Sequence, residues 1–325
     1  MDETFHTVMD RWTKVGLLQL DPVFKSPEES IKQANELIAS LSEGEIDLLI
    51  LPELAFTGYN FKSYEDIEEF VESEVDGLST SWAKSTAKKL KCHVMVGFPQ
   101  RIQSQEDIKD NQSERPIKKC YNALSIVSDS GELLKVYHKT QLYPPVDPLW
   151  AKAGDGFLMI NLNIGKRRTD ESNRVSRDLV RCCIGICMDL SPDKFEAPFD
   201  RFELASFAIN NNCEVLICSM AWLDSVQGVD PNRTDHGKSW NEVKDTLNYW
   251  ALRCTPIWKA KDQTFIACNR VGKEDGTVFT GTSCVISNHQ SHNLIADSNR
   301  PTVLDYASKH KPELLLVDVP LSSCL

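Results

Sequence analysis

The sequence lacks long apolar runs, an excess of basic residues and the usual cysteine–histidine pattern of a zinc site. No apolar segment approaches the roughly 20 residues that a membrane-spanning helix needs, so we expect no membrane partner. Acidic residues outnumber basic ones by 47 to 36, and a net charge of -11 disfavours binding to nucleic-acid phosphates. His289 and His292 lie in a polar stretch without a nearby Cys-x-x-Cys pair, so we expect no zinc.

The sequence also lacks internal repeats, low-complexity segments and an evident linker. Its 325 residues mix strand and helix patterns throughout, which favours a single α/β domain over residues 1–325. The 11 cysteines are odd in number, and Met1 to Thr13 is polar and mixed in charge, unlike a secretion signal. We therefore expect free thiols in a reducing compartment, namely the cytoplasm, with the nucleus as the alternative.

Apolar patterns and turn residues predict the order of the elements. Strands are expected at 12–20, 47–51, 93–97, 121–127, 133–137, 179–187, 214–218, 264–270, 281–286 and 313–319. Helices are expected from Pro27 onward and over 82–90, 202–209 and 250–261, the last one kinked or ended by Pro256. Residues 101–119, 166–177 and 224–240 are polar and are expected to form exposed connections.

The segment around Cys187 has the pattern of a strand that ends in a sharp turn. Ile184, Gly185 and Ile186 precede the cysteine, and Met188 follows it. A cysteine in this place is held by a rigid element and can face the free N–H groups of the turn, as a nucleophile requires. Cysteine is also a common core residue, and burial without chemistry is the plainer interpretation for any one of the 11 cysteines.

Two other predicted strands end in charged residues. Glu53 follows Pro52 after the strand at 47–51, and it is either fixed in a poorly solvated place or exposed in a loop. Lys139 follows the strand at 133–137, where a solvated surface lysine is the common case. The ends of strands tend to gather at one edge of an α/β sheet, where functional sites form.

If these three residues meet, their chemistry is complementary. Glu53 can take the thiol proton and later activate water, and Lys139 can stabilise a thiolate and a developing oxyanion. Cys187 can attack a carbonyl carbon to give a thioester, with the N–H of Met188 as a second oxyanion donor. No histidine lies beside the cysteine motif, which disfavours a protease of the Cys–His kind.

Three motifs in this order resemble the Glu-Lys-Cys signature of the nitrilase superfamily of carbon–nitrogen hydrolases. They are Pro52-Glu53, Tyr137-His138-Lys139-Thr140 and Gly185-Ile186-Cys187-Met188-Asp189, and the resemblance extends to Asn269-Arg270-Val271-Gly272 near the end of the chain. It implies a four-layer α-β-β-α sandwich with no metal or organic cofactor. This chain has Met188 and Ser191 where most relatives have an aromatic residue and an arginine.

Within the superfamily, two segments look like those of the fungal N-terminal amidohydrolases. The segments Cys187-Met188-Asp189-Leu190-Ser191-Pro192 and Met220-Ala221-Trp222-Leu223 carry this resemblance. It implies deamidation of N-terminal Asn and Gln to Asp and Glu with release of ammonia, a step that feeds the N-degron pathway. The implied partners are N-terminal Asn or Gln peptides or proteins, without nucleic acid or membrane, and a homodimer is an open alternative.

Substrate-binding residues are expected from the need to hold an α-ammonium group with carboxylates or carbonyls. Asp147, Asp189 and Glu196 are candidates by position. Asp147 replaces the second glutamate that the superfamily often carries, and a surface-loop aspartate is an equal alternative. Asp189 is alternatively bonded to N–H groups of nearby turns. Trp222 and Tyr59 either wall the pocket or are core aromatics.

Two other functions remain open on the sequence. The first is a small-molecule ω-amidase or carbamoylase of the same superfamily. The second is a catalytically inactive binding protein, which the presence of Glu53, Lys139 and Cys187 disfavours.

Overall fold

Strands that are buried on both faces form the centre of the fold, as the unbroken apolar runs of the sequence require. The structure is a computed structural model that describes residues 11–102, 119–169, 175–225, 238–289 and 300–321. Every residue of β2 (Leu48–Ile50), β9 (Val215–Met220) and β10 (Thr264–Asn269) is buried. These three strands lie in the interior of the two sheets and not at their edges.

The first sheet has the strand order β15-β1-β2-β3-β4-β5, and β6 also pairs with β4. Its other strands are β1 (Arg11–Gln19), β3 (His93–Arg101), β4 (Cys120–Val127), β5 (Leu133–His138), β6 (Ala151–Lys152) and β15 (Glu313–Leu321). Strands β1, β2 and β3 are parallel, and β4 is antiparallel to both β3 and β5. Strand β5 therefore runs in the same direction as β2, so Glu53 and Lys139 follow strands that end at the same edge.

The second sheet has the order β14-β13-β10-β9-β8-β7. Its other strands are β7 (Leu158–Thr169), β8 (Val175–Ile186), β13 (Cys284–Ser287) and β14 (Thr302–Tyr306). Strands β8, β9 and β10 are parallel, so their carboxyl ends also share one edge. A separate small ribbon pairs β11 (Lys273–Glu274) with β12 (Thr277–Val278).

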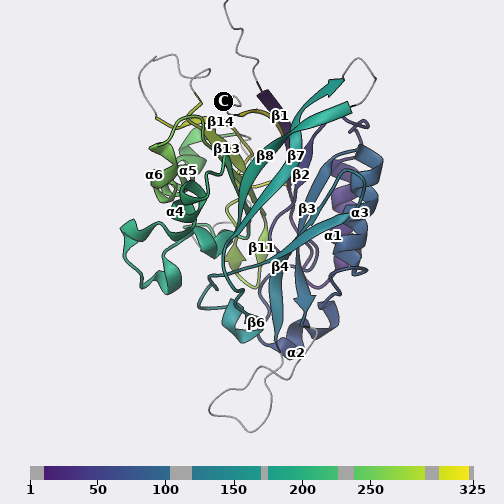
Figure 1. Ribbon diagram of the computed structural model, residues 1–325. Coiled ribbons are helices and arrows are strands. Elements are labelled where there is room, and N and C mark those ends of the chain that lie inside the picture. Colours follow the sequence, from purple (N-terminus) through teal and green to yellow (C-terminus); the bar gives the residue numbers. More distant parts are fainter. Residues whose placement is uncertain (1–10, 103–118, 170–174, 226–237, 290–299, 322–325) are drawn as a thin grey trace, which may run out of the picture.

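The two sheets face each other, and helices cover their outer faces (Figure 1). Apolar side chains of both sheets, among them Leu17, Ile50, Ile184 and Ile217, form one buried cluster. Helices α1 (Pro27–Leu37) and α3 (Leu78–Leu90) lie against the first sheet, and α4 (Glu203–Asn210), α5 (Trp240–Arg253) and α6 (Thr255–Trp258) lie on the other side. The short helix α2 (Tyr64–Ile67) lies at one end of the molecule. The α-β-β-α sandwich expected from the resemblance is therefore confirmed.

The prediction of a polar excursion at residues 166–177 was wrong. Strands β7 and β8 form a long antiparallel hairpin through this stretch, with Arg167 opposite Arg177, and β7 itself was not predicted. A two-stranded ladder is held by backbone hydrogen bonds, so polar side chains do not interrupt it. Polar composition is therefore a poor indicator of where a hairpin ends.

The helix boundaries also differ from those expected. Helix α3 begins at Leu78, four residues before the predicted start, and α5 begins at Trp240 and ends before Pro256. Pro256 lies in the first turn of α6, where its missing N–H costs nothing. The other two predicted loops lie largely outside the described residues. No helix of the described part of the chain is long and apolar enough to cross a membrane.

Gly97 in β3 determines how closely the Glu53 segment can pack. A Cβ atom on Gly97 would lie 2.6 Å from the oxygen of Pro52, 2.7 Å from the nitrogen of Leu54 and 2.8 Å from the Cα of Glu53. These are backbone atoms, so the segment rather than a flexible side chain would have to move.

We expect Gly97→Ala to lower the free energy of unfolding by about 1–3 kcal/mol, as overpacking does, and to lower the rate of any reaction in which Glu53 takes part, because Glu53 is displaced. Urea unfolding and a rate assay measure the two effects. Gly16→Ala in β1 is the matched control, because its Cβ would contact only side-chain methyl groups at 3.1–3.4 Å. Equal effects of the two substitutions would contradict this role of Gly97.

Candidate active site

Glu53 is buried and points into the protein, not to solvent. Its side chain has no exposed surface. One carboxylate oxygen, Oε1, accepts hydrogen bonds from Asn122 Nδ2 and Lys139 Nζ, both at 2.6 Å. The other, Oε2, accepts from the backbone N–H of Ala221 at 2.9 Å. The carboxylate is thus held by groups from both sheets.

Lys139 is equally buried, so the surface-lysine interpretation is excluded. Its Nζ lies 2.6 Å from Glu53 Oε1 and 2.7 Å from Asp147 Oδ2, and its side chain has no exposed surface. Its backbone N–H donates to the carbonyl of Asn122 at 2.8 Å, which continues the β4–β5 ladder by one residue. An ammonium group has three donors, so one remains after Glu53 and Asp147 are satisfied.

Asp147 belongs to this cluster and is not the surface-loop aspartate considered from the sequence. It opens a 3-10 helix, η3 (Asp147–Leu149), and is fully buried. Its Oδ1 accepts from Tyr59 Oη at 2.8 Å, and its Oδ2 accepts from the backbone N–H of Tyr143 at 2.8 Å and from Lys139. Asp147 therefore holds the ammonium group of Lys139 in place. Asp147 does not line the pocket described below.

Cys187 begins the short 3-10 helix η4 (Cys187–Leu190), one residue after the end of β8. Its φ angle of 42° lies in the left-handed region, where a residue with a Cβ is strained by about 1–2 kcal/mol. Strain of this kind collects at functional sites, where the surroundings enforce it. The residue is 8% exposed, and it borders the pocket.

Burial and charge set the protonation states of the cluster. Burial raises the pKa of the Cys187 thiol well above its usual value, Glu53 raises it further, and Lys139 lowers it. Burial also raises the pKa of Glu53, with Lys139 opposing and Asp147 reinforcing the shift. Burial alone would lower the pKa of Lys139, but the carboxylates of Asp147 and Glu53 outweigh it and raise that pKa. The resting site therefore has a neutral thiol, a charged ammonium and a carboxylate whose affinity for a proton is increased.

Asp189, expected as a possible ligand for the substrate, lies within the turn that supports Cys187. It is 1% exposed and accepts hydrogen bonds from the backbone N–H groups of Ile186, Thr140 and Gln141 and from Tyr137 Oη. The alternative of bonds to turn N–H groups is thus the correct one. Asp189 joins the Cys187 turn to the segment that follows Lys139. Glu196 is exposed and does not line the pocket.

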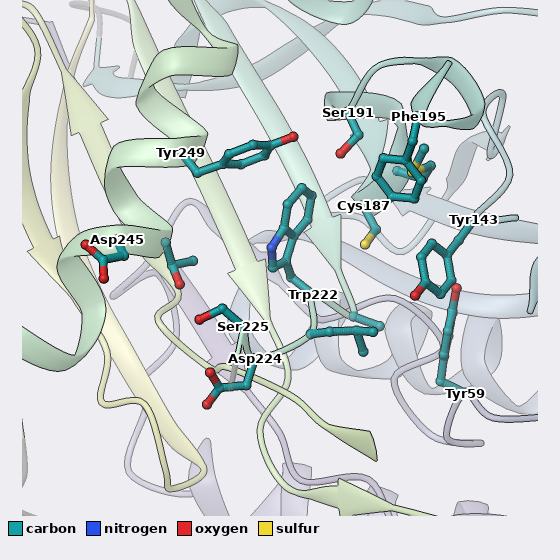
Figure 2. A pocket seen from close by; sticks show the side chains of 14 residues that line it. Tyr59, Tyr143, Cys187, Ser191, Phe195, Trp222, Asp224, Ser225, Asp245 and Tyr249 are labelled. Carbon is teal, nitrogen blue, oxygen red and sulfur yellow. The ribbon is translucent and has the colours of Figure 1, made fainter. Parts of the chain in front are cut away.

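A pocket of about 470 Å³ opens at Cys187 (Figure 2). Both aromatic residues expected there, Tyr59 and Trp222, line it. Tyr143, Phe195 and Tyr249 also line it and were not predicted. Figure 2 shows Phe195 and Tyr143 on one side of the sulfur atom and Trp222 on the other. The volume is typical of a small-ligand site and exceeds what one side-chain amide fills.

Asn269, at the end of β10, fixes the wall that carries Trp222. Its Oδ1 accepts from the backbone N–H of Trp222 at 2.7 Å, and its Nδ2 donates to the carbonyl of Gly281 at 2.7 Å. These bonds hold the segment after β9 in place beside the Glu53 carboxylate.

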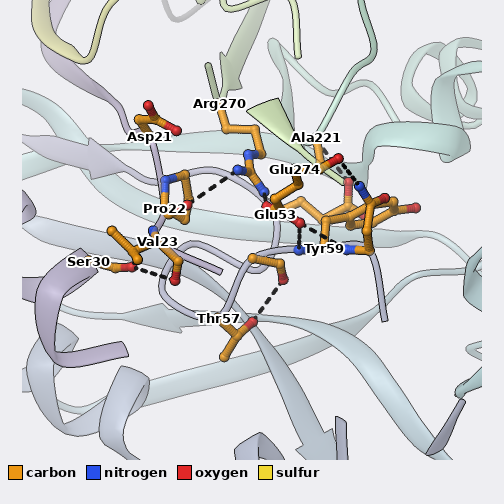
Figure 3. A network of polar contacts seen from close by, with 12 residues as sticks. Asp21, Pro22, Val23, Ser30, Glu53, Thr57, Tyr59, Ala221, Arg270 and Glu274 are labelled. Carbon is orange, nitrogen blue, oxygen red and sulfur yellow. Dashed lines mark hydrogen bonds and ion pairs between the residues drawn. The ribbon is translucent and has the colours of Figure 1, made fainter. Parts of the chain in front are cut away.

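A buried ion pair fixes the loop that carries Tyr59 (Figure 3). Arg270 and Glu274 are in contact, and Glu274 Oε1 accepts from the backbone N–H groups of Tyr59 at 2.9 Å and Asn60 at 3.0 Å. If the loop moved, the buried carboxylate of Glu274 would lose these two hydrogen bonds, which would cost free energy. Tyr59 can therefore hold Asp147 in a fixed position.

Arg253 of α5 holds the backbone after the Cys187 turn. It is buried, its Nε donates to the carbonyl of Leu190 at 2.8 Å, and it also bonds to the carbonyl of Phe199. Its Nη2 donates to Glu203 Oε2 at 3.3 Å. An arginine distant in sequence thus supports the backbone that follows the Cys187 turn.

The described part of the chain shows no group of three or more His, Cys, Asp and Glu side chains that could hold a metal ion. His289 Nε2 lies 3.2 Å from the carbonyl oxygen of Leu321. His292 lies outside the described residues. All 10 cysteines of the described segments are buried and free.

Comparison with known proteins agrees with this geometry. The family model of carbon–nitrogen hydrolases matches residues 14–171. A protein N-terminal amidase of Schizosaccharomyces pombe is 31% identical over 298 residues, covering 87% of this chain and 93% of the relative. The chain belongs to the carbon–nitrogen hydrolase family. A protein N-terminal amidase of Saccharomyces cerevisiae is 32% identical over 248 residues, which cover 74% of this chain and 51% of that longer protein.

Solved structures of carbon–nitrogen hydrolases share the fold. A crystal structure of an N-terminal amidase with an Asn-Glu-Ala peptide superposes with a TM-score of 0.75 at 23% identity, covering 96% of this chain and 98% of the other. An amidase of Nesterenkonia from the nitrilase superfamily superposes with a TM-score of 0.58 at 17% identity, covering 95% and 92%. At these identities the likeness shows the fold.

Sequence reasoning missed three of the polar residues that hold the site. Asn122 had a visible signal, because it is an amide inside the mainly apolar strand at 121–127. Asn269 was noted only as part of a motif, with no role attached. Arg253 had no signal at all, because its partners Leu190 and Phe199 are backbone carbonyls of a distant segment.

We expect Arg253→Met to lower the free energy of unfolding by about 3 kcal/mol, because the Glu203 side chain, which is only 9% exposed, loses its charged partner. It should also lower kcat, because the backbone after Cys187 loses two hydrogen bonds. Urea unfolding and steady-state kinetics measure these effects. Arg201→Met is the matched control, since Arg201 is an exposed arginine in the segment that Arg253 contacts at Phe199. A kcat unchanged by Arg253→Met would show that the arginine supports the fold alone.

Proposed function

We propose that the chain is an amidohydrolase that converts N-terminal Asn and Gln of peptides and proteins to Asp and Glu with release of ammonia. The observation that carries the proposal is the buried Glu53–Lys139–Cys187 cluster at an open pocket. The cluster occurs in a chain that is 31% identical to a protein N-terminal amidase and covers 93% of that relative's length. The cluster supports the reaction class, and the relatives support the peptide substrate.

Cys187 is proposed as the nucleophile that attacks the side-chain amide carbon. Glu53 accepts the thiol proton on Oε2, which has a lone pair left beside its bond to the Ala221 N–H. The oxygen of the amide becomes negative as the new C–S bond forms. The third N–H of Lys139 stabilises this charge, and so does the N–H of Met188 in the first turn of η4, where N–H groups lack helical partners.

Collapse of this tetrahedral intermediate breaks the C–N bond. Glu53 returns its proton to the leaving nitrogen, ammonia departs, and a thioester to Cys187 remains. Water then enters the emptied position and gives a proton to Glu53 as it attacks the thioester carbon. The C–S bond breaks, the proton returns to the sulfur, and the product carries Asp or Glu at its N-terminus.

The charge of the cluster favours a substrate with a free N-terminus. With Cys187 neutral, the carboxylates of Glu53 and Asp147 outnumber the one ammonium of Lys139. An α-ammonium group held close to the reacting carbon offsets this surplus of negative charge. The proposed products have the acidic N-termini that the N-degron pathway uses. We also propose that the enzyme acts in the cytoplasm, with the nucleus as the alternative.

A small-molecule ω-amidase is the second candidate. A 2-oxoglutaramate amidase of Bacillus subtilis is 31% identical over 155 residues, which cover 46% of this chain. This likeness spans less of the chain than the likeness to the N-terminal amidases, so we rank it second.

Ammonia release from Asn-Gly and Gln-Gly tests the proposal. We expect turnover of both dipeptides, little turnover of their N-acetylated copies, and little turnover of 2-oxoglutaramate. Cys187→Ala should lower the rate by about 10⁴-fold or more, and Lys139→Ala nearly as much. Cys213→Ala, which removes a buried thiol that does not line the pocket, should keep the rate. Equal turnover of acetylated and free dipeptides would defeat the claim that a free N-terminus is required.

The pH profile of kcat/KM on a dipeptide amide gives an independent test. Burial raises the pKa of Glu53, and Lys139 offsets this only in part. Glu53 must be ionised to accept the thiol proton, so activity should fall as the pH drops through a value above about 4.3, the ordinary pKa of a glutamate. The α-ammonium group of a peptide loses its proton near pH 8, so activity should also fall at about that pH or above.

Lys139 should add no alkaline limb below pH 10, because the carboxylates raise its pKa. A rate that stays constant down to pH 4 would contradict Glu53 as the base. A rate that stays constant up to pH 10 would contradict recognition of the ammonium group.

A further inference from the structure

Phe195 is held at the mouth of the pocket in an unfavourable conformation. It lies in the 3-10 helix η5 (Asp193–Phe195), and it is 57% exposed although its side chain is large and apolar. Lys194 and Phe195 both have left-handed backbones, with φ angles of 54° and 59°. Neither is a glycine, so both conformations are strained. The exposed ring gains little from burial in the core, so core packing does not explain why this strain is kept.

The surrounding hydrogen bonds enforce this conformation. The N–H of Phe195 donates to the carbonyl of Pro192 at 2.9 Å, and the N–H of Asp193 donates to Glu203 Oε1 at 3.3 Å. Glu203 is held in turn by Arg253. The turn that presents Phe195 is therefore fixed by the same buried arginine that supports the backbone after Cys187.

Phe195 is also coupled to the buried cluster through Tyr143. The two rings pack edge to face, with centroids 6.1 Å apart and planes at 88°. The backbone N–H of Tyr143 donates to Asp147, which holds Lys139. Both rings line the pocket, and Figure 2 shows them on the same side of Cys187.

The arrangement leaves space for more than the reacting residue. The side-chain amide of an N-terminal Asn or Gln must lie against Cys187, and it occupies only the inner part of the 470 Å³ pocket. The rest of the pocket is free for the peptide chain, and Phe195 is among the residues that line it. An apolar side chain at the second position of the peptide would bury both its own surface and that of the ring.

We propose that Phe195, supported by Tyr143, binds the side chain of the second residue of the substrate and favours large apolar residues there. This inference rests on the proposed function and adds a determinant of specificity to it. Asp224 and Asp245 line the other side of the pocket, beyond Trp222 in Figure 2, and would favour a basic second residue instead. The two possibilities predict different substrate preferences.

The test compares kcat/KM for the amides of Asn-Gly, Asn-Leu, Asn-Phe and Asn-Lys. We expect the unaltered enzyme to prefer Asn-Leu and Asn-Phe over Asn-Gly by about tenfold, mainly through a lower KM. Phe195→Ala should reduce this ratio to near one, mainly by raising KM for Asn-Leu and Asn-Phe. Phe195→Tyr keeps the ring and should keep the preference.

Leu179→Ala is the matched control, because Leu179 is 58% exposed and does not line the pocket. It should leave all four values unchanged. The inference is overturned if Asn-Gly and Asn-Leu are equally good substrates, if Phe195→Ala keeps the preference, or if Asn-Lys is the best substrate. In these cases the proposed function stands, because N-terminal Asn is still deamidated. Absence of ammonia release from all four peptides would overturn the proposed function, and this inference with it.

Discussion

The site depends on a buried ammonium group between two buried carboxylates. Lys139 contacts Glu53 at 2.6 Å and Asp147 at 2.7 Å, and none of the three side chains is exposed. Removing these charges from water costs several kcal/mol per ion, and only close pairing with further hydrogen bonds offsets the cost. Asn122, Tyr59 and two backbone N–H groups provide those bonds. The loops after β2 and β5 are therefore fixed by electrostatics as much as by apolar packing.

A second constraint acts on the nucleophile. Cys187 has a strained backbone at the end of β8, and Asp189 binds four donors around it. Arg253 then holds the chain beyond the turn. The strain can persist because the surroundings leave the backbone no alternative. The turn is thus held from both ends, by Asp189 within it and by Arg253 at the carbonyl of Leu190.

The sequence predicted the fold well wherever apolar periodicity was clear. The central strands around Ile50, Ile217 and Ile266 were placed to within a residue or two. The convergence of Glu53, Lys139 and Cys187 also followed from sequence, because each residue follows a strand. The β7–β8 hairpin was missed because its ladder is independent of side-chain polarity. Contacts such as those of Arg253 with carbonyl groups could not be predicted, since any residue can supply a carbonyl.

The bonds of Glu53 connect the two sheets. Asn122 and Lys139 bind its carboxylate from the first sheet, and the N–H of Ala221 binds it from the end of β9 in the second. The proton acceptor therefore keeps its place only while the sheets keep their relative position. Substitutions deep in the layer between the sheets, far from any substrate, can thus change the reaction rate by shifting one sheet against the other while the fold stays intact.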